Sequence, residues 1–182
     1  VANAVILFNQ PNTESIASSL VTNQSWLWGG LTNDDYTNPV NWYQWNGNNW
    51  DKSVTELPTA TSDVFVLSND ESGICVSDVN AVQLIDDIAS LTIGTAATAS
   101  LDGSIEIPGD ITNLGSLVGV SNSELRLSGT SNQTLGGGGV FNLFDFTITN
   151  GSNTVTLNND LSVANRLNLD GGPLDNVNHL LT

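Results

Sequence analysis

Basic residues are nearly missing from this sequence of 182 residues: three lysines and arginines face nineteen aspartates and glutamates, a formal net charge of −16. Nucleic acid binding depends on Lys and Arg contacts to phosphates, so we expect no nucleic acid partner. The same shortage argues against attraction to an anionic membrane surface. No apolar run is long enough to span a bilayer, so direct membrane insertion is not expected either. Divalent cations are compatible with this charge balance.

Sulfur and histidine are also scarce: the chain has no methionine, one cysteine and one histidine. A single cysteine excludes an intrachain disulfide, and the β-branched neighbours of Cys75 indicate a small buried side chain rather than a reactive thiol. His179 alone gives no zinc ligand set. The sequence has neither an initiator methionine nor a basic N-terminal region, so we expect a processed or trimmed chain from which any signal peptide has gone.

Charged residues make up only 12 % of the chain, and Asn, Thr, Ser and Gly take their place. These residues favour turns and strand surfaces over helices. No window shows a sustained period of 3.6 residues, which an amphipathic helix would need. The composition therefore predicts an all-β protein.

A repeated tripeptide in the second half of the chain has apolar first and third residues and a polar middle residue. Copies begin at Ile105, Leu125, Phe146 and Leu167, which are 20, 21 and 21 residues apart, and a turn follows each. A further copy at Leu91 is taken as the first. Apolar–polar alternation indicates a half-buried strand, and a fixed period of this length is typical of a solenoid. The polar middle residues of all five copies are expected to line one outer face.

Further short strands lie between the copies, giving about three strands for each coil of about 21 residues. This pattern predicts a parallel β-helix. Val155, Leu161 and Leu167 are six residues apart, which is typical of left-handed hexapeptide helices, but the coil length drifts elsewhere. The drift favours the right-handed form. The four glycines at 136–139 predict a corner or bulge, not a phosphate-binding loop, because no lysine follows them.

We expect two parts: an N-terminal cap rich in tryptophan over residues 1–57, and the solenoid over 58–182. A cap protects the first coil from pairing with other chains. The next repeat after Leu167 would begin beyond residue 182, so we expect the solenoid to be truncated in mid-coil and to continue into a longer chain.

All five tryptophans and both tyrosines lie within residues 26–50, around a hairpin signal at Asn46-Gly47. One interpretation is a local core that seals the end of the stack, with Trp26 and Trp42 as its most buried members. The other is a carbohydrate site, because flat aromatic faces stack on sugar rings. For that site the candidate residues are Tyr43, Trp45 and Trp50, the last two expected to be the most exposed.

Calcium is the one cofactor for which the sequence offers candidate ligands, Asp34 and Asp35, although neither belongs to a known calcium-loop pattern. A polysaccharide lyase would need a Lys or Arg base, and the candidates are Arg126 and Arg166. These occupy different positions relative to their tripeptides, so they are not expected to form one site. The sequence therefore predicts no catalytic residues and a protein that is not an enzyme.

The order of several short elements resembles repeat-rich surface proteins of the Bacteroidetes type. The elements are Trp-Gly-Gly at 28–30, Asn-Pro-Val-Asn-Trp at 38–42, Pro-Thr-Ala at 58–60, Asp-Val at 63–64 and Leu-Thr-Ile-Gly at 91–94. The resemblance implies a secreted protein, exported by type IX secretion and displayed at or released from the cell surface, with roles in adhesion or gliding motility. The family's C-terminal sorting domain is not seen in these residues.

From residues and resemblance together, we expect a structural or adhesive segment of a large exported bacterial surface protein. Its partners would be surface glycans or proteins of the secretion and surface machinery. The first alternative is a carbohydrate-binding module on a β-helix, and the second is a lyase-like enzyme.

Overall fold

The computed structural model describes residues 21–22, 24–30, 35–52, 54–67, 81–176 and 178–182. The predicted strands at 5–8 and 74–76, Cys75 and Asp34 lie outside these ranges. Apart from one short 3-10 turn, η1 (Pro39–Asn41), the regular elements are strands: β1 (Ser25–Trp28), β2 (Trp42–Trp45), β3 (Trp50–Asp51), β4 (Asp63–Val66), β5 (Ala81–Leu84), β6 (Ser90–Ile93), β7 (Thr98–Leu101), β8 (Ser104–Ile107), β9 (Ile111–Asn113), β10 (Ser116–Gly119), β11 (Glu124–Leu127), β12 (Gln133–Gly136), β13 (Val140–Thr149), β14 (Val155–Leu157), β15 (Leu161–Gly171) and β16 (Leu174–Asp175).

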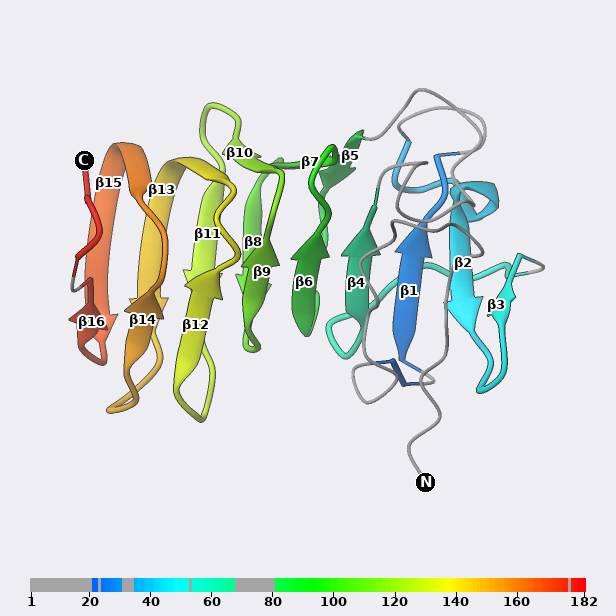
Figure 1. Cartoon of the computed structure of the whole chain (residues 1–182), viewed down its shortest axis with the longest axis horizontal. Coiled ribbons are helices and arrows are strands. Elements are labelled where there is room, and N and C mark those ends of the chain that lie inside the picture. The colour runs from blue at the N-terminus through cyan, green and yellow to red at the C-terminus, as the bar shows by residue number, and fades with distance from the viewer. Residues whose placement is uncertain (1–20, 23, 31–34, 53, 68–80, 177) are drawn as a thin grey trace.

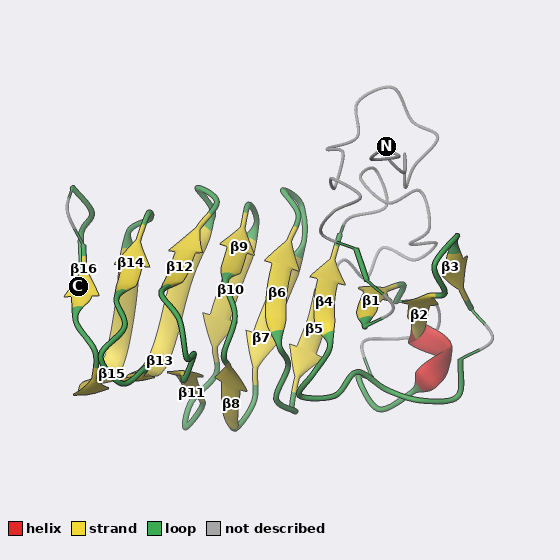
Figure 2. Cartoon of the chain, turned by 90° about the horizontal axis from the view of Figure 1, so that it is seen from below, coloured by secondary structure: helices red, strands yellow, loops and turns green. Residues whose placement is uncertain are grey.

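The strands form a solenoid with three walls, as Figures 1 and 2 show. One sheet runs in the order β16-β14-β12-β9-β6-β4-β1-β2-β3, and we call its stretch from β4 to β16 the first wall. In the second sheet, the first half of β13 pairs with β10 and its second half pairs with β11. The second wall therefore contains β5, β7, β10 and the first halves of β13 and β15. The third wall contains β8, β11 and their second halves.

The predicted fold class is confirmed: the chain is a right-handed parallel β-helix with an aromatic-rich N-terminal end (Figures 1 and 2). On the third wall, Ile105, Leu125, Phe146 and Leu167 are neighbours in register, so the coils there are 20 or 21 residues long. Coil length varies more on the first wall, where Leu91 pairs with Ile111 but Ile111 pairs with Leu135.

The expectation that Leu91 starts the same ladder is wrong. Strand β6 lies on the first wall, between β4 and β9. Thr92 therefore does not line up with the other polar middle residues, whereas Glu106, Arg126, Thr147 and Asn168 do. The apolar–polar–apolar pattern is common to all three walls, so it identifies a strand without identifying the wall.

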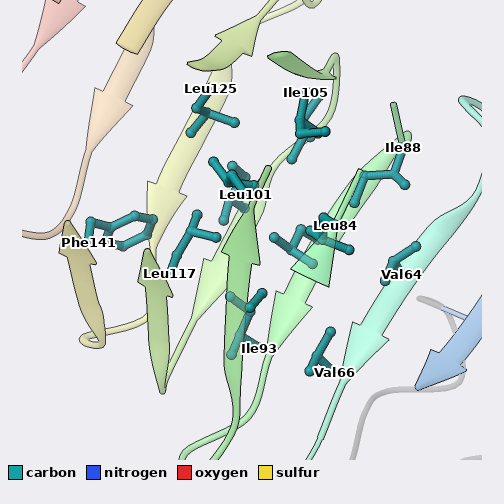
Figure 3. Close-up of a cluster of buried hydrophobic side chains, with 14 of the residues drawn as sticks. Val64, Val66, Leu84, Ile88, Ile93, Leu101, Ile105, Leu117, Leu125 and Phe141 are labelled. Atoms are coloured by element: carbon teal, nitrogen blue, oxygen red, sulfur yellow. The ribbon is translucent and has the colours of Figure 1, made fainter. Parts of the chain in front are cut away.

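Strand alternation fills the interior with one apolar side chain at every second position. Figure 3 shows these side chains meeting from all three walls. Ile93 comes from the first wall, Leu101 and Leu117 from the second, and Ile105 and Leu125 from the third, and all are fully buried. Each such side chain contributes about 1.5–3 kcal/mol to folding by leaving water.

The glycine run forms the corner between β12 and β13, as the sequence predicts. The corner is stitched to the coils on either side by two buried asparagines. Asn113 donates to the carbonyl of Val140 at 2.8 Å, and Asn159 donates to the carbonyl of Gly139 at 2.9 Å. Gly137 has φ +114°, and a Cβ there would lie 2.4 Å from the carbonyl oxygen of Asn113.

Gly137→Ala should destabilise the solenoid much more than Gly138→Ala. Both glycines have positive φ, but a Cβ on Gly138 meets nothing within 4 Å. Gly138→Ala should thus cost only the left-handed strain of about 1–2 kcal/mol. Gly137→Ala adds a backbone clash of about 1–3 kcal/mol. Urea unfolding followed by circular dichroism measures both, and equal costs would contradict the close approach seen here.

Candidate functional site

The aromatic residues near the N-terminal end form two groups on opposite faces of β1 and β2. Trp28 is paired with Trp42, so both rings point to the solenoid core, with centroids 4.9 Å apart. Tyr36 packs edge to face on Trp42 at 5.2 Å, and its backbone carbonyl accepts a 2.9 Å hydrogen bond from Trp42 Nε1. Trp26 and Trp42 are buried, as expected for a local core.

The hydroxyl of Tyr36 is enclosed by this inner group. Burial raises the pKa of Tyr36 well above its ordinary value, and the nearby Asp86 carboxylate raises it further. The hydroxyl lies 3.5 Å from the carbonyl oxygen of Pro58, which can accept its proton. Tyr36 therefore stays neutral and acts as a packing residue.

The outer group brings together the three candidate sugar-binding residues. The hairpin predicted at Asn46-Gly47 is present, and it pairs Trp45 with Trp50, whose ring centroids are 5.5 Å apart. Trp50 also contacts Phe65 at 6.2 Å. Tyr43 packs against the same apolar cluster, which contains Leu27, Phe65 and Leu67.

Exposure within the outer group differs from the expectation. Trp45 is only 6 % exposed, because its ring packs edge to face against Trp50 instead of standing free beside the turn. Trp50 and Tyr43 are half-buried. A sugar ring would therefore meet Tyr43 and Trp50, with Trp45 behind them. The indole Nε1 of Trp50 has no hydrogen-bond partner among the described residues.

The remaining calcium candidate, Asp35, lies in an exposed turn before η1. Its Oδ1 accepts hydrogen bonds from the backbone nitrogen of Thr37 at 2.9 Å and from the Thr37 hydroxyl at 2.7 Å. The described residues contain no group of three or more His, Cys, Asp or Glu side chains suited to a metal. Calcium binding at Asp34 and Asp35 stays a prediction.

The structure assembles a charged cluster on the third wall that the sequence interpretation missed. Ser104, Glu124, Asp145 and Arg166 stand in one outward column, each from the next coil. Arg166 lies 3.1 Å from Asp145 Oδ2 and 3.6 Å from Glu124 Oε1. Arg126, from the neighbouring column, lies 3.4 Å from Glu124 Oε2.

The expectation that the two arginines would not share a site is wrong. They differ by two positions relative to their tripeptides, but both side chains reach the carboxylate of Glu124. Register does not fix where a long side chain ends. Aligning the residue that precedes each tripeptide would have revealed the column of Glu124, Asp145 and Arg166.

The electrostatics of the cluster suit cohesion between coils better than base catalysis. Burial would raise the pKa of Glu124, but hydrogen bonds from Thr147 and Ser104 and the charge of Arg126 outweigh it and hold the pKa below its usual range. The Thr147 hydroxyl donates to Glu124 Oε1 at 2.5 Å. Arginines beside ionised carboxylates stay protonated, so they can pair with an anion but are poor bases.

The low pKa of Glu124 predicts a loss of stability in acid. A carboxylate with a folded pKa below its unfolded value stabilises the fold above the unfolded pKa, and this stabilisation is lost as pH falls through the folded pKa. The free energy of unfolding should therefore drop as pH falls below the ordinary value of 4.5. Urea titrations between about pH 3 and 7 should show a shallower drop for Glu124→Gln.

The neighbouring Glu106→Gln controls for the loss of one negative charge. If Glu124→Gln and the wild type lose stability in parallel as pH falls, the contribution assigned to Glu124 is contradicted.

An open groove of about 480 Å³ lies between the last coils, beside Val140, Asn159 and Leu161. His179 Nδ1 sits 3.6 Å from Asp160 Oδ1 at its rim. The same Asp160 oxygen accepts the backbone N–H of Leu180 at 2.8 Å. These contacts tie the C-terminal residues to the preceding coil.

Comparison with known proteins finds no matching family model, no similar curated protein and no similar solved structure. A search of the described residues for a helix long and apolar enough to cross a membrane also finds none. Functional inference therefore rests on the geometry above.

Proposed function

We propose that this chain is a structural and adhesive segment of a large exported bacterial cell-surface protein. The observation that carries the proposal is the continuous parallel ladder of the first wall, which runs from β4 to β16 around one apolar core. In a solenoid each coil contacts only its neighbours, so length can be added without changing the design. A rod of this kind suits a protein that projects from a cell.

Contacts between coils support a scaffold role. Gln133 bonds to carbonyls of the preceding coil, Asn159 bonds to the glycine corner before it, and Arg166 pairs with carboxylates of two earlier coils. These contacts all cross from one coil to the next, and they add to the backbone ladders in resisting separation of the coils. The strongly acidic composition is compatible with a secreted, cell-surface location.

Antibody labelling of intact cells of the source organism tests the proposed location. We expect labelling without permeabilisation and loss of the signal after brief protease treatment. Beads coated with the protein should also resist detachment in a flow chamber better than beads coated with an unrelated protein of equal charge. Labelling that requires cell lysis, or equal detachment of the two kinds of bead, would count against the proposal.

Carbohydrate binding is a second candidate, favoured by the placement of Tyr43, Trp45 and Trp50 on one face. A glycan array and sugar titrations of tryptophan fluorescence test it. We expect quenching by at least one plant or algal polysaccharide, and its loss in Trp50→Ala. Val40→Ala, which changes an exposed residue of the same region, serves as the control. Flat responses across the array would remove this candidate.

A further inference from the structure

The core of the solenoid is open at β15. One inward row contains Ile105, Leu125 and Phe146, which are fully buried, and then Leu167, which is 38 % exposed. The parallel row ends in the same way, in Leu169, which is 51 % exposed. Two leucines in core positions therefore face water, at the end of the stack drawn at the left of Figure 1.

The backbone of β15 is half covered along this edge. Its first residues pair with the C-terminal residues, since Val163 N donates to Thr182 O at 2.8 Å and Thr182 N donates to Leu161 O at 3.1 Å. Residues 166–170 have β13 on one side and, among the described residues, no strand on the other. We call residues 166–170 the open edge. Such an edge favours strand addition.

The sequence of the open edge is self-complementary. It reads Arg-Leu-Asn-Leu-Asp, with opposite charges at its two ends, a leucine inside each charge and an asparagine in the centre. Antiparallel pairing of two copies about Asn168 would set Arg166 opposite Asp170 and Leu167 opposite Leu169, each pairing occurring twice. Facing residues in a sheet lie on the same side, so the leucines would meet in the core and the charges on the outside.

Side-chain positions in the single chain agree with this arrangement. Asn168 Nδ2 donates to Asp170 Oδ2 at 2.7 Å, which places the Asp170 carboxylate on the outer face although the strand is bulged there. The Arg166 side chain remains exposed while it pairs with Asp145, so its guanidinium can accept another carboxylate.

We propose that two copies of this chain join end to end through their open edges, forming a two-fold symmetric dimer. The contact buries Leu167 and Leu169 of both copies and extends the third wall across the junction. Symmetry doubles every interaction, so a single substitution acts at two places. The proposal goes beyond the scaffold function, because it assigns the open edge an occupant.

Analytical ultracentrifugation in about 0.15 M salt, where repulsion between acidic chains is screened, tests the assembly. We expect a concentration-dependent dimer. Leu169→Lys should weaken it about tenfold or more, and Asp170→Lys should weaken it by setting a cation against Arg166 of the second copy. Val140→Lys, at a residue 52 % exposed outside the open edge, should leave it unchanged.

Cysteine cross-linking tests the register in a Cys75→Ser background. Facing Cα atoms in an antiparallel pair are about 4.5–5.5 Å apart, within disulfide range, so Asn168→Cys should oxidise to a covalent dimer. In Asp170→Cys the two sulfurs would be about four residues, or ~13 Å, apart and should stay reduced. A protein that is monomeric at all concentrations, or equal cross-linking at both positions, overturns the proposal.

Discussion

Trp42→Ala should give one of the largest losses of stability in the chain, about 3–5 kcal/mol. The side chain is fully buried and packs on Trp26, Trp28 and Tyr36. Truncation would remove these ring contacts and leave a cavity between the cap and the first coils. It also leaves the carbonyl of Tyr36 without the indole donor. Since domains are stable by only about 5–15 kcal/mol, such a loss should unfold the N-terminal region first.

Urea unfolding followed by far-ultraviolet circular dichroism measures this cost without depending on tryptophan emission. Trp50→Ala is the matched control, because it removes the same side chain from a half-buried position on the outer face. It should cost clearly less than Trp42→Ala. Equal losses would show that the inner aromatic group has no special role in closing the solenoid.

Gln133→Ala should destabilise the solenoid by about 3 kcal/mol or more, although glutamine is not a typical core residue. The buried amide accepts a 3.0 Å hydrogen bond from the backbone nitrogen of Gly129 and donates to the carbonyls of Ile107 and Gly109 at 2.9 and 2.8 Å. Truncation leaves these backbone groups unpaired at the corner between β11 and β12. Each unmet bond in a buried setting costs about 1–3 kcal/mol.

The matched control for this variant is Gln83→Ala. Gln83 is exposed and makes a 3.0 Å bond to Asp102. Its replacement should change stability by no more than about 0.5 kcal/mol. If thermal and urea unfolding give the two alanine variants the same cost, the corner does not depend on the buried amide.

The sequence predicts the fold well because one wall keeps its period. Ile105, Leu125, Phe146 and Leu167 are spaced by 20 or 21 residues and are neighbours in the structure. Leu91 was assigned to the wrong wall because strand alternation has the same appearance on all three. The corner between β12 and β13 also lengthens the coil on the first wall, and no rule of composition gives the size of such an insertion.

The candidate sites were harder to predict because they depend on side-chain directions. The hairpin at Asn46-Gly47 was predicted, but the burial of Trp45 depends on its edge-to-face contact with Trp50. The meeting of Arg126 and Arg166 at Glu124 spans two coils and requires the register of the third wall. Periodicity gives the order of coils, whereas a site depends on which side chains reach one another across them.

The glycine corner between β12 and β13 also has a practical meaning. At Gly138 the chain points away from the body, and a Cβ there would meet nothing within 4 Å. The coils on both sides are held by Asn113 and Asn159, whose bonds reach Val140 and Gly139. Foreign peptides grafted at Gly138 would be carried on a firm base, so the solenoid offers a natural display position for epitopes or affinity tags.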